Sequence, residues 1–278
     1  MPDLDPDDRL LAAALTARGV AVEPAVWDAP VDWAAYDLAV LRSTWDYPPR
    51  RDEFVAWARA VPRLANPADV VAWNTDKRYL KTLAEAGVPV VPTQWISAVD
   101  GWEPPAADDI VIKPAVGAGS VDSGRYSPQD RELATAHVGR LVSAGRLVMV
   151  QPYLAAVDTY GETAMLFLAG RFSHAVRKGP LLTGPDFGVD GLYREEDISP
   201  RRPSAAERAA AEQALAALPF DDLLYARVDV VPGPDGAPLV IEVELTEPSL
   251  FFGTAEGAAD RLAAEILLRL RNVPIRQV

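Results

Sequence analysis

The feature that most restricts how this chain can fold is an apolar stretch near its carboxyl end that carries three acids. The stretch VIEVELTEPSLFF runs from Val240 to Phe252 and contains Glu242, Glu244 and Glu247. Because alternate residues of a strand share a face, Glu242 and Glu244 point the same way, about 6–7 Å apart. The fold must therefore provide these carboxylates with either solvent or a positively charged partner on one face of a sheet.

A second strand brings another acid to the same place. The segments YARVDVV and PLVIEVEL are typical of a hairpin, and Asp229 then lies opposite Ile241 or Glu242, depending on a bulge. Carboxylates crowded on a partly buried face are costly without a counter-charge, which divalent cations supply. Mg²⁺ favours one or two carboxylates together with phosphate oxygens. The alternative is a solvated sheet face whose acids point to water.

Lysine is rare here, so each lysine suggests a specific role. Only four of the 27 basic residues are lysines: Lys77, Lys81, Lys113 and Lys178. We expect Lys77 in the first turn of a helix that is capped by Asn74 or Thr75 and ended by Gly87. A phosphate at that position would meet both the ammonium and the free backbone N–H groups of the helix.

Lys113 ends the strand DIVIKP and precedes the glycine-rich segment PAVGAGSVDSG. Backbone N–H groups and hydroxyls suited to phosphate come from Gly117, Gly119, Ser120 and Ser123. The segment lacks the G-x-x-x-x-G-K-[ST] pattern of a P-loop and is a weak signal alone. A lysine-bearing strand, a glycine loop and paired acids downstream together indicate a site for nucleotide phosphates.

Composition excludes several classes of protein. The net charge of −13 argues against nucleic acid or an anionic membrane as the main partner. The absence of cysteine excludes disulfides and thiolate metal sites, and the two histidines lack the spacing of a metal site or catalytic triad. Neither a signal peptide nor an apolar run of about 18 residues is evident, so we expect a cytoplasmic protein.

The remaining pattern predicts an α/β protein. In the first third, strands alternate with helices, as in a parallel sheet. The expected strands are Val20–Trp27, Leu38–Leu41 and Leu64–Asn66, and the expected helices are Leu10–Arg18 and Asp52–Val61.

Further along, three short strands at 90–96, 109–114 and 147–153 surround a helix at Gln129–Ser143. A hairpin at 162–178, a long loop to Pro203, a helix opened by the capping box of Ser204 and Glu207, the acidic hairpin and a helix at Ala258–Leu270 follow.

A loop near the start could contact a substrate. LRSTWDY leaves a strand at the carboxyl edge, where open parallel sheets bind their ligands. Its Arg42, Trp45, Asp46 and Tyr47 suit a small polar molecule. A surface loop with a packed tryptophan is an equal alternative.

In this order, the motifs resemble those of the ATP-grasp superfamily along nearly the whole chain. LRSTWDY, WNTDKRYL, KPAVGAGS, FSHAVRKGP and EPSLF are similar to motifs of the O-ureido-D-serine cyclo-ligases, which form D-cycloserine. Glutathione synthetase is a more distant relative. The resemblance implies an ATP-grasp fold. In such a fold an N-terminal parallel α/β domain (1–74) would be followed by two α+β subdomains that clamp ATP. The first subdomain would be a small lid (75–152), and the second would bind the metal (153–278).

The resemblance also implies roles for individual residues. Lys77 and Lys113 would bind phosphates, and the loop from Gly117 to Ser123 would close over the γ-phosphate. The adenine hinge would be Gln151, Tyr153 and Leu154, with Asp158 on the ribose. Arg177 and Arg227 would stabilise the transferring phosphoryl group. Asp229, Glu242 and Glu244 would hold two Mg²⁺ ions, for which Mn²⁺ can substitute. Glu247 and Ser249 would lie beside the substrate.

The implied activity is that of an ADP-forming carbon–nitrogen ligase. ATP would activate a carboxyl or carbonyl-type oxygen of an amino-acid-like substrate, and a nitrogen nucleophile would then attack. Cyclisation of O-ureido-D-serine is one outcome. An amino-acid or dipeptide ligase and a non-catalytic ATP-binding protein are the alternatives. A homodimer is also compatible with the sequence.

Two departures from the resemblance stand out. Glu244 occupies a metal position that is usually Asn in glutathione synthetase-like enzymes, which adds negative charge. Relatives usually open with an apolar strand, whereas Met1 falls almost where that strand would end. Either the start is misassigned, the chain is trimmed, or another segment or subunit fills the gap.

Overall fold

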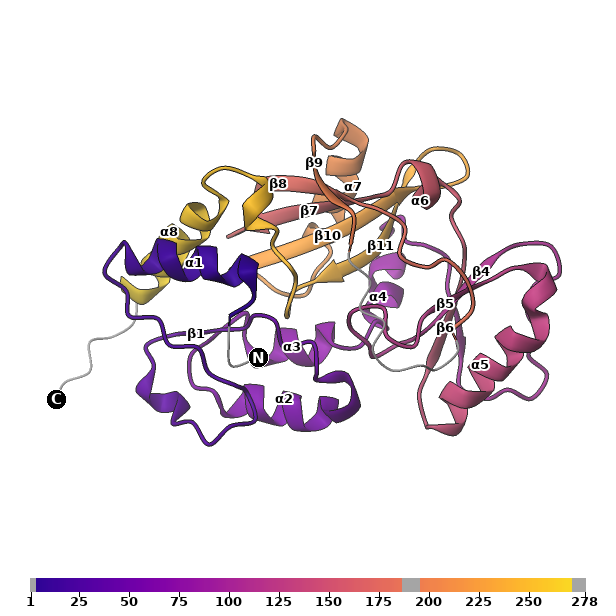
Figure 1. Ribbon diagram of the computed structural model, residues 1–278, viewed down its shortest axis with the longest axis horizontal. Coiled ribbons are helices and arrows are strands. Elements are labelled where there is room, and N and C mark those ends of the chain that lie inside the picture. Colours follow the sequence, from indigo (N-terminus) through magenta and orange to yellow (C-terminus); the bar gives the residue numbers. More distant parts are fainter. Residues whose placement is uncertain (1–3, 187–195, 272–278) are drawn as a thin grey trace.

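Three sheets organise the computed structural model, which describes residues 4–186 and 196–271 (Figure 1). A two-stranded sheet belongs to the N-terminal part, a four-stranded sheet has the order β3-β6-β4-β5, and a five-stranded sheet has the order β11-β10-β7-β8-β9. The four-stranded sheet with its helix lies at the right of Figure 1, and the five-stranded sheet spans the top.

The N-terminal part is a small α/β unit. Its elements are α1 (Pro6–Thr16), β1 (Ala39–Val40), α2 (Arg51–Ala60), β2 (Leu64–Ala65) and α3 (Ala68–Asn74), with 3-10 turns at Trp33–Ala35 and Pro48–Arg50. β1 and β2 pair in parallel, as the alternation of strands and helices predicts. Trp27, Leu41, Tyr47 and Phe54 pack together in its core, with the Tyr47 ring stacked on Phe54 at 5.0 Å.

The strand predicted over Val20–Trp27 is wrong, because these residues form no ladder. Pro24 lies in the middle of the segment, where it removes a backbone donor that a strand needs. Within the described residues no strand precedes α1, so the opening strand that relatives usually have is not seen from Leu4 onward. Instead α1 packs against α8 (Ala258–Arg271) through Leu11 and Leu15.

The helix predicted from Asn74 or Thr75 to Gly87 is two helices. Asn74 ends α3, and α4 runs over Tyr79–Glu85, so Lys77 lies in the connection and not in a first helical turn. The cap is lost because the side-chain amide of Asn74 bonds β11, donating to Val243 O at 2.7 Å and accepting from Leu245 N at 2.7 Å.

The four-stranded sheet contains the three strands and packs against the helix that the sequence predicts between residues 90 and 153. It comprises β3 (Gln94–Ile96), β4 (Ile110–Pro114), β5 (Gly124–Tyr126) and β6 (Val148–Pro152), and α5 (Arg131–Ser143) packs on it. Ser127 and Asp130 form a capping box at the 3-10 turn Pro128–Asp130 that leads into α5. The short edge strand β5 was not predicted, since three residues carry too little alternation to be read.

The five-stranded sheet contains both predicted hairpins. Its strands are β7 (Glu162–Leu168), β8 (Arg171–Lys178), β9 (Ile198–Arg201), β10 (Tyr225–Pro232) and β11 (Pro238–Glu244), with helices α6 (Ala156–Thr159) and α7 (Ala205–Ala216) and a 3-10 turn at Phe252–Thr254. The capping box of Ser204 and Glu207 is confirmed at the start of α7. β9 was not predicted and lies in the expected loop.

A buried asparagine joins the N-terminal unit to the large sheet. Asn66 donates to Tyr225 O at 2.8 Å and Leu245 O at 2.7 Å, and it accepts from Leu224 N at 2.7 Å. Its backbone has φ 56°, a left-handed conformation that asparagine tolerates better than most residues. These bonds satisfy strand ends that would otherwise be buried without partners.

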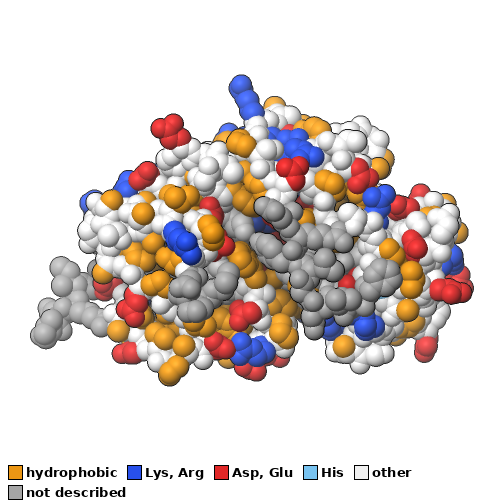
Figure 2. Space-filling model, viewed as in Figure 1, with side chains coloured by type: hydrophobic (Ala, Val, Ile, Leu, Met, Phe, Trp, Pro, Cys, Tyr) orange, Lys and Arg blue, Asp and Glu red, His pale blue; other side chains and the backbone are white. Residues whose placement is uncertain are grey.

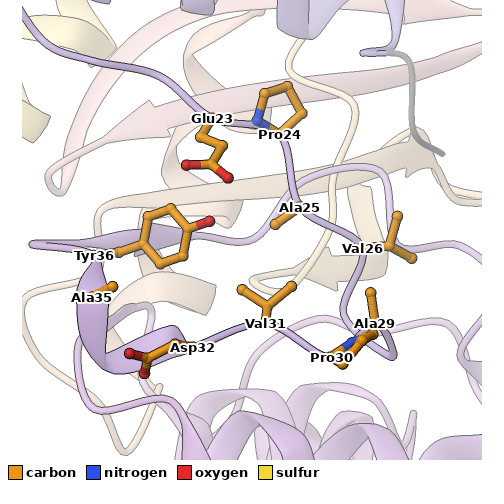
Figure 3. A pocket seen from close by; sticks show the side chains of 10 residues that line it. All are labelled: Glu23, Pro24, Ala25, Val26, Ala29, Pro30, Val31, Asp32, Ala35 and Tyr36. Carbon is orange, nitrogen blue, oxygen red and sulfur yellow. The ribbon is translucent and has the colours of Figure 1, made fainter.

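Three further features concern the surface and the helices. Lys and Arg side chains on the face shown in Figure 2 are scattered among acids and form no basic stripe. No helix in the described part of the chain has the length and apolar character needed to cross a bilayer. An open hollow of about 590 Å³ is lined by residues 23–36, with Glu23 and Tyr36 pointing toward each other (Figure 3).

Candidate active site

One face of the five-stranded sheet carries an unusual density of charge. Asp229 pairs with Glu242, Arg227 with Glu244, and Glu162 with Lys178 across neighbouring strands. Ala164 of β7 lies opposite both Asp229 and Val176, which puts all six charged residues on one face. We call these six residues the charged face.

Within the charged face, opposite charges are in direct contact. Asp229 accepts from Arg227 Nε at 2.8 Å and Nη2 at 2.9 Å, and from Lys178 Nζ at 3.0 Å. Arg227 Nη2 also reaches Glu244 Oε1 at 2.5 Å, and Lys178 lies 3.4 Å from Glu162. Burial alone would raise the pKa of Asp229, but Arg227 and Lys178 lower it to about 2.

Two more lysines reach this face from outside the sheet. Lys77 Nζ lies 2.8 Å from Glu242 Oε1 and donates to Gly117 O at 2.9 Å. Lys113, near the end of β4, feels the charges of Glu242 and Lys77, and burial is the main cause of its lowered pKa. Among the described residues no acid lies within ion-pair distance of Lys113.

Two glutamates hold their protons unusually strongly. Burial raises the pKa of Glu244 to about 7, with Arg227 opposing the shift and Glu242 and Asp229 adding to it. Burial and the nearby charge of Glu244 raise the pKa of Glu247 to about 8. Negative charge is therefore in excess at this end of β11.

The glycine-rich segment forms a loop between β4 and β5. Gly119, Ser120 and Asp122 have φ of 60°, 57° and 55°, so the chain turns through left-handed conformations there. The hydroxyl of Ser123 lies 3.5 Å from Val121 O, and the Ser120 side chain is exposed. The loop meets Lys77 through Gly117, which brings two of the predicted phosphate-binding elements together.

The predicted adenine hinge lies at the end of β6. Leu154 packs with Val91, Val231 and Ile241 in a small apolar cluster. The Gln151 side chain is buried and donates to Thr93 Oγ1 at 2.8 Å. The cluster places the predicted hinge beside Ile241 of β11.

Asp158, predicted to contact the ribose, is engaged by protein groups. Its carboxylate accepts from Tyr153 Oη at 2.5 Å and from Arg125 Nη1 at 3.2 Å. The Arg125 guanidinium lies 3.6 Å from the centre of the Tyr153 ring.

The structure does not bring Arg177 to the charged face. In β8, Arg177 precedes Lys178, and side chains of successive strand residues point to opposite faces. Arg177 instead donates to Tyr160 O at 3.1 Å and pairs with Asp197 at 2.8 Å.

Lys178 and Glu162 occupy the charged face and were missed as site residues. The signal that could have found Lys178 is the scarcity of lysine. Three of the four lysines gather here, and Lys81 lies 5.0 Å over the Trp95 ring.

The four residues of the LRSTWDY loop divide by position. Arg42 is held by Asp8 at 2.6 Å and donates to Pro248 O at 2.8 Å, and Asp46 contacts Trp27 Nε1 at 3.2 Å. Trp45 and Tyr47 lie instead beside Glu247. Trp45 Nε1 donates to Glu247 O at 3.1 Å, and the Tyr47 hydroxyl lies close enough to the Glu247 carboxyl to lower its pKa.

Ser249 lies next to the charged face through its backbone, since Ser249 O accepts from Arg227 Nη1 at 3.3 Å. Phe251, two residues on, has φ 51°, and its ring lies 5.6 Å from the Arg227 guanidinium. The segment that follows β11 is thus bound to both the sheet and the N-terminal loop.

A connecting segment links the two larger sheets. Residues 179–186 leave β8 directly after Lys178 and dock on β5, where Gly184 O accepts from Arg125 N at 2.9 Å. Asp186 N donates to Tyr126 Oη at 3.1 Å, and the Asp186 carboxylate pairs with Arg140. Arg140 also pairs with Asp122 of the glycine-rich loop at 2.9 Å. Residues 187–195 of the long loop expected up to Pro203 lie outside the described residues.

This arrangement suits a polyanion. Lysines and arginines that converge on a buried face can neutralise phosphate oxygens, and carboxylates beside them can hold the cation that accompanies a nucleotide. Within the described ranges, no three acids or histidines stand close enough together to form a ready metal cluster. The carboxylates contact lysine and arginine instead.

Comparison with known proteins identifies the family. A family model described as the N-terminal domain of D-cycloserine synthetase DcsG matches residues 1–66. Over 96% of its length the chain is 38% identical to the cycloserine biosynthesis protein DcsG of Streptomyces lavendulae, covering 95% of that protein.

Solved structures agree with this result. The crystal structure of D-cycloserine synthetase DcsG superposes with a TM-score of 0.83 at 35% identity, covering 95% of this chain and 94% of that one. The ATP-grasp ligase PsnB, complexed with a minimal precursor, Mg and ADP, has a TM-score of 0.62 at 18% identity over 96% and 94% of the two chains. The expected ATP-grasp fold is confirmed, and the chain belongs to the DcsG family of ATP-grasp ligases.

Proposed function

We propose that this ligase uses ATP to activate the carboxyl group of an amino-acid-like substrate and closes O-ureido-D-serine into D-cycloserine. The observation that carries the proposal is the convergence of Lys77, Lys113, Lys178 and Arg227 on the carboxylates of one sheet face. The similarity to DcsG over nearly the whole chain supports the choice of substrate.

In this proposal the nucleotide lies between the four-stranded sheet and the charged face. Lys77 and Lys113 bind its phosphates, and the loop that contains Gly117, Gly119, Ser120 and Ser123 covers the γ-phosphate. Adenine packs against Leu154 at the hinge formed with Gln151 and Tyr153, and the ribose binds near Asp158. The residues 75–152 then act as a lid between the N-terminal domain (1–74) and the C-terminal subdomain (153–278).

The acids of the charged face fit a magnesium ion. The raised pKa of Glu244, caused by burial and by repulsion from Glu242 and Asp229, is relieved when a divalent cation binds there. Asp229, Glu242 and Glu244 would hold it, and the ion would neutralise charge on the nucleotide phosphates. Carboxylate oxygens are the ligands that this ion prefers, and Glu at position 244 keeps the donor set entirely of that type.

The proposed reaction has three steps: transfer of the γ-phosphoryl group, transfer of the acyl group to nitrogen, and hydrolysis of the carbamoyl group. A carboxylate oxygen of the substrate attacks the γ-phosphorus, which gives an acyl phosphate and ADP. The N–O nitrogen of the ureido group loses its proton and attacks the carbonyl carbon, and phosphate leaves. Ring closure leaves a carbamoyl group on the ring nitrogen, which water removes as carbon dioxide and ammonia. Arg227 and Lys178 face the phosphoryl group and balance its charge.

The test is a reaction with Mg²⁺-ATP and O-ureido-D-serine, followed by mass spectrometry with ADP and phosphate measured in parallel. D-cycloserine formed with an equal amount of ADP supports the proposal. ADP formed together with a different amino-acid product would show that the substrate assignment is wrong and that the ligase assignment is right. As a check on the phosphate site, we expect Lys113→Ala to weaken nucleotide binding by about tenfold or more, the loss of one charge-assisted contact.

A further inference from the structure

Glu247 stands at the boundary between the charged face and the N-terminal loop. It follows β11 by three residues, and only 9% of it is exposed. The Trp45 indole holds its backbone oxygen, and Arg42 holds the next carbonyl, that of Pro248. The backbone that carries the Glu247 side chain is therefore held by the N-terminal loop.

Its lack of a cationic partner distinguishes Glu247 from the other acids of the site. Glu162, Asp229, Glu242 and Glu244 each lie within 4 Å of a lysine or arginine. Among the described residues, no lysine or arginine lies within that distance of Glu247, and its neighbouring polar group is the hydroxyl of Tyr47. A buried carboxylate without a counter-charge is costly, so a positive group that arrives with a ligand would bind tightly there.

The neighbours of Glu247 indicate which ligand supplies that charge. Glu244, Lys77 and Glu242 are near enough to affect its pKa, so the carboxyl borders the phosphate-binding cluster. Two aromatic residues of the N-terminal loop also adjoin Glu247: Tyr47, whose ring belongs to the apolar core of the N-terminal unit, and Trp45, whose indole bonds the Glu247 backbone. A small organic cation would fit here if it were attached to the group being phosphorylated. It would pair with Glu247 while that group lay at the phosphate-binding cluster.

We propose that Glu247 binds the protonated α-amine of an α-amino-acid substrate. This rests on the proposed function, because it takes the acidic group next to that amine to be the one activated at the charged face. The ion pair keeps the amine cationic, so it has no lone pair for attack and survives in the product. A different nitrogen of the substrate must then be the nucleophile. Glu247 is thus the residue that selects amino acids over simple carboxylic acids.

The experiment measures binding by calorimetry with Mg²⁺ and a non-hydrolysable ATP analogue present. The two probes are O-ureido-D-serine and 3-(ureidooxy)propanoic acid, which lacks only the amine. We expect the wild-type protein to prefer the amine by at least about 30-fold, the size of effect seen when one partner of a buried charge pair is removed. Glu247→Gln should reduce this preference to about threefold or less. Glu85→Gln, on an exposed helix position, is the matched control and should keep it.

Equal binding of both probes by the wild-type protein would overturn the assignment and needs no variant. A folded Glu247→Gln protein that keeps the full preference would overturn it too. Affinity for the ATP analogue should change less than about threefold in this variant, and a larger loss that is equal for both probes would mean a metal or nucleotide role instead. A separate assay with Mg²⁺-ATP tests the reaction itself. If the amine preference depends on Glu247 but no ADP forms with O-ureido-D-serine in that assay, the proposed ligase reaction is wrong and the amine site stands.

Discussion

Asp229 lies directly opposite Glu242 because the β10–β11 ladder shifts by one residue beside them. Toward the turn, Val230 pairs with Val240, so Ile241 has no partner and forms a bulge. Without this bulge Asp229 would face Ile241, and Glu242 would lie on the other side of the sheet. The extra residue therefore puts both acids on the charged face.

The first prediction concerns Glu242. Replacing it with Gln keeps the side-chain shape but removes the charge that Lys77 contacts at 2.8 Å. We expect kcat for ADP formation to fall by about 100-fold or more, the range found when a positioned electrostatic group is lost at an active site. The melting temperature should change little, since the residue is partly exposed. Near-normal turnover in this variant would remove Glu242 from the metal and phosphate site.

The second prediction separates Lys178 from its neighbours. Lys178→Met should lower kcat by about 100-fold, because it removes a cation held by Asp229 on the charged face. Lys81→Met is the matched control, since Lys81 packs on Trp95, and its activity should stay near that of the wild type.

The neighbouring Arg177 should matter less for activity than Lys178. Arg177→Met should affect kcat far less than Lys178→Met, because Arg177 contacts Asp197 on the opposite face. Steady-state kinetics of both variants decides the matter. A larger loss at Arg177 would restore the role that the family resemblance implies for it.

Stability should depend on pH through Glu247. Its folded pKa of about 8 lies above the ordinary value of 4.5, so between these values the folded state holds the proton more tightly than the unfolded state does. Stability from this group is thus full below about pH 4.5 and is lost as the pH rises through about 8.

The measurement is the melting temperature of ligand-free wild type and Glu247→Gln from pH 5 to pH 9. We expect the variant to lose less stability than the wild type over this range, since Gln does not ionise. Parallel curves for the two proteins would show that Glu247 titrates normally.

Docking of the connecting segment on β5 should depend on Gly124. A Cβ there would lie 2.6 Å from Asp186 N, too close for the segment to stay in place. In Gly124→Ala the amide of Arg125, which donates to Gly184 O, should exchange its hydrogen markedly faster. Gly139→Ala is the control, because a Cβ at that position meets nothing within 4 Å. Unchanged protection of Arg125 would show that the segment adjusts.

Asn66 should contribute strongly to stability. Asn66→Ala leaves Leu224 N, Tyr225 O and Leu245 O without their partner in a buried place. We expect a loss of about 3 kcal/mol in the free energy of unfolding, from buried groups that cost about 1–3 kcal/mol each. Urea denaturation measures it, with exposed Gln129→Ala as the comparison. A change below about 1 kcal/mol would mean that water replaces the side chain.

Local sequence signals predicted the two hairpins and the capping box at the start of α7. The box of Ser204 and Glu207 acts within one turn, so the sequence contains all of its information. Tertiary contacts decided the rest. Asn74 looked like a cap but bonds β11, and the strand expected around Pro24 had no partner to pair with. Which of Arg177 and Lys178 faces the site depends on the register of β8, which neighbouring strands fix.

The sequence singled out several residues that the structure brings together on the charged face, but not the contacts among them. Paired acids on β11, a lysine before a glycine loop and the acid on β10 share a pattern that sequence order reveals. No sequence pattern identifies Glu162 as a site residue, because an acid at the start of a strand is usually solvated. Its closeness to Lys178 follows only from the pairing of β7 with β8. The lone position of Glu247 likewise depends on contacts between segments about 200 residues apart.

The docked segment makes a mechanical linkage between two parts of the protein. One end is covalently next to Lys178 on the charged face, and the other is fastened to β5 and, through Arg140, to the glycine-rich loop. If the four-stranded sheet swings away from the five-stranded sheet, this tether must either detach or pull on Lys178. Opening of the site to release ADP would then also move Lys178 away from the other residues of the charged face. Residues 179–186 would couple the two movements.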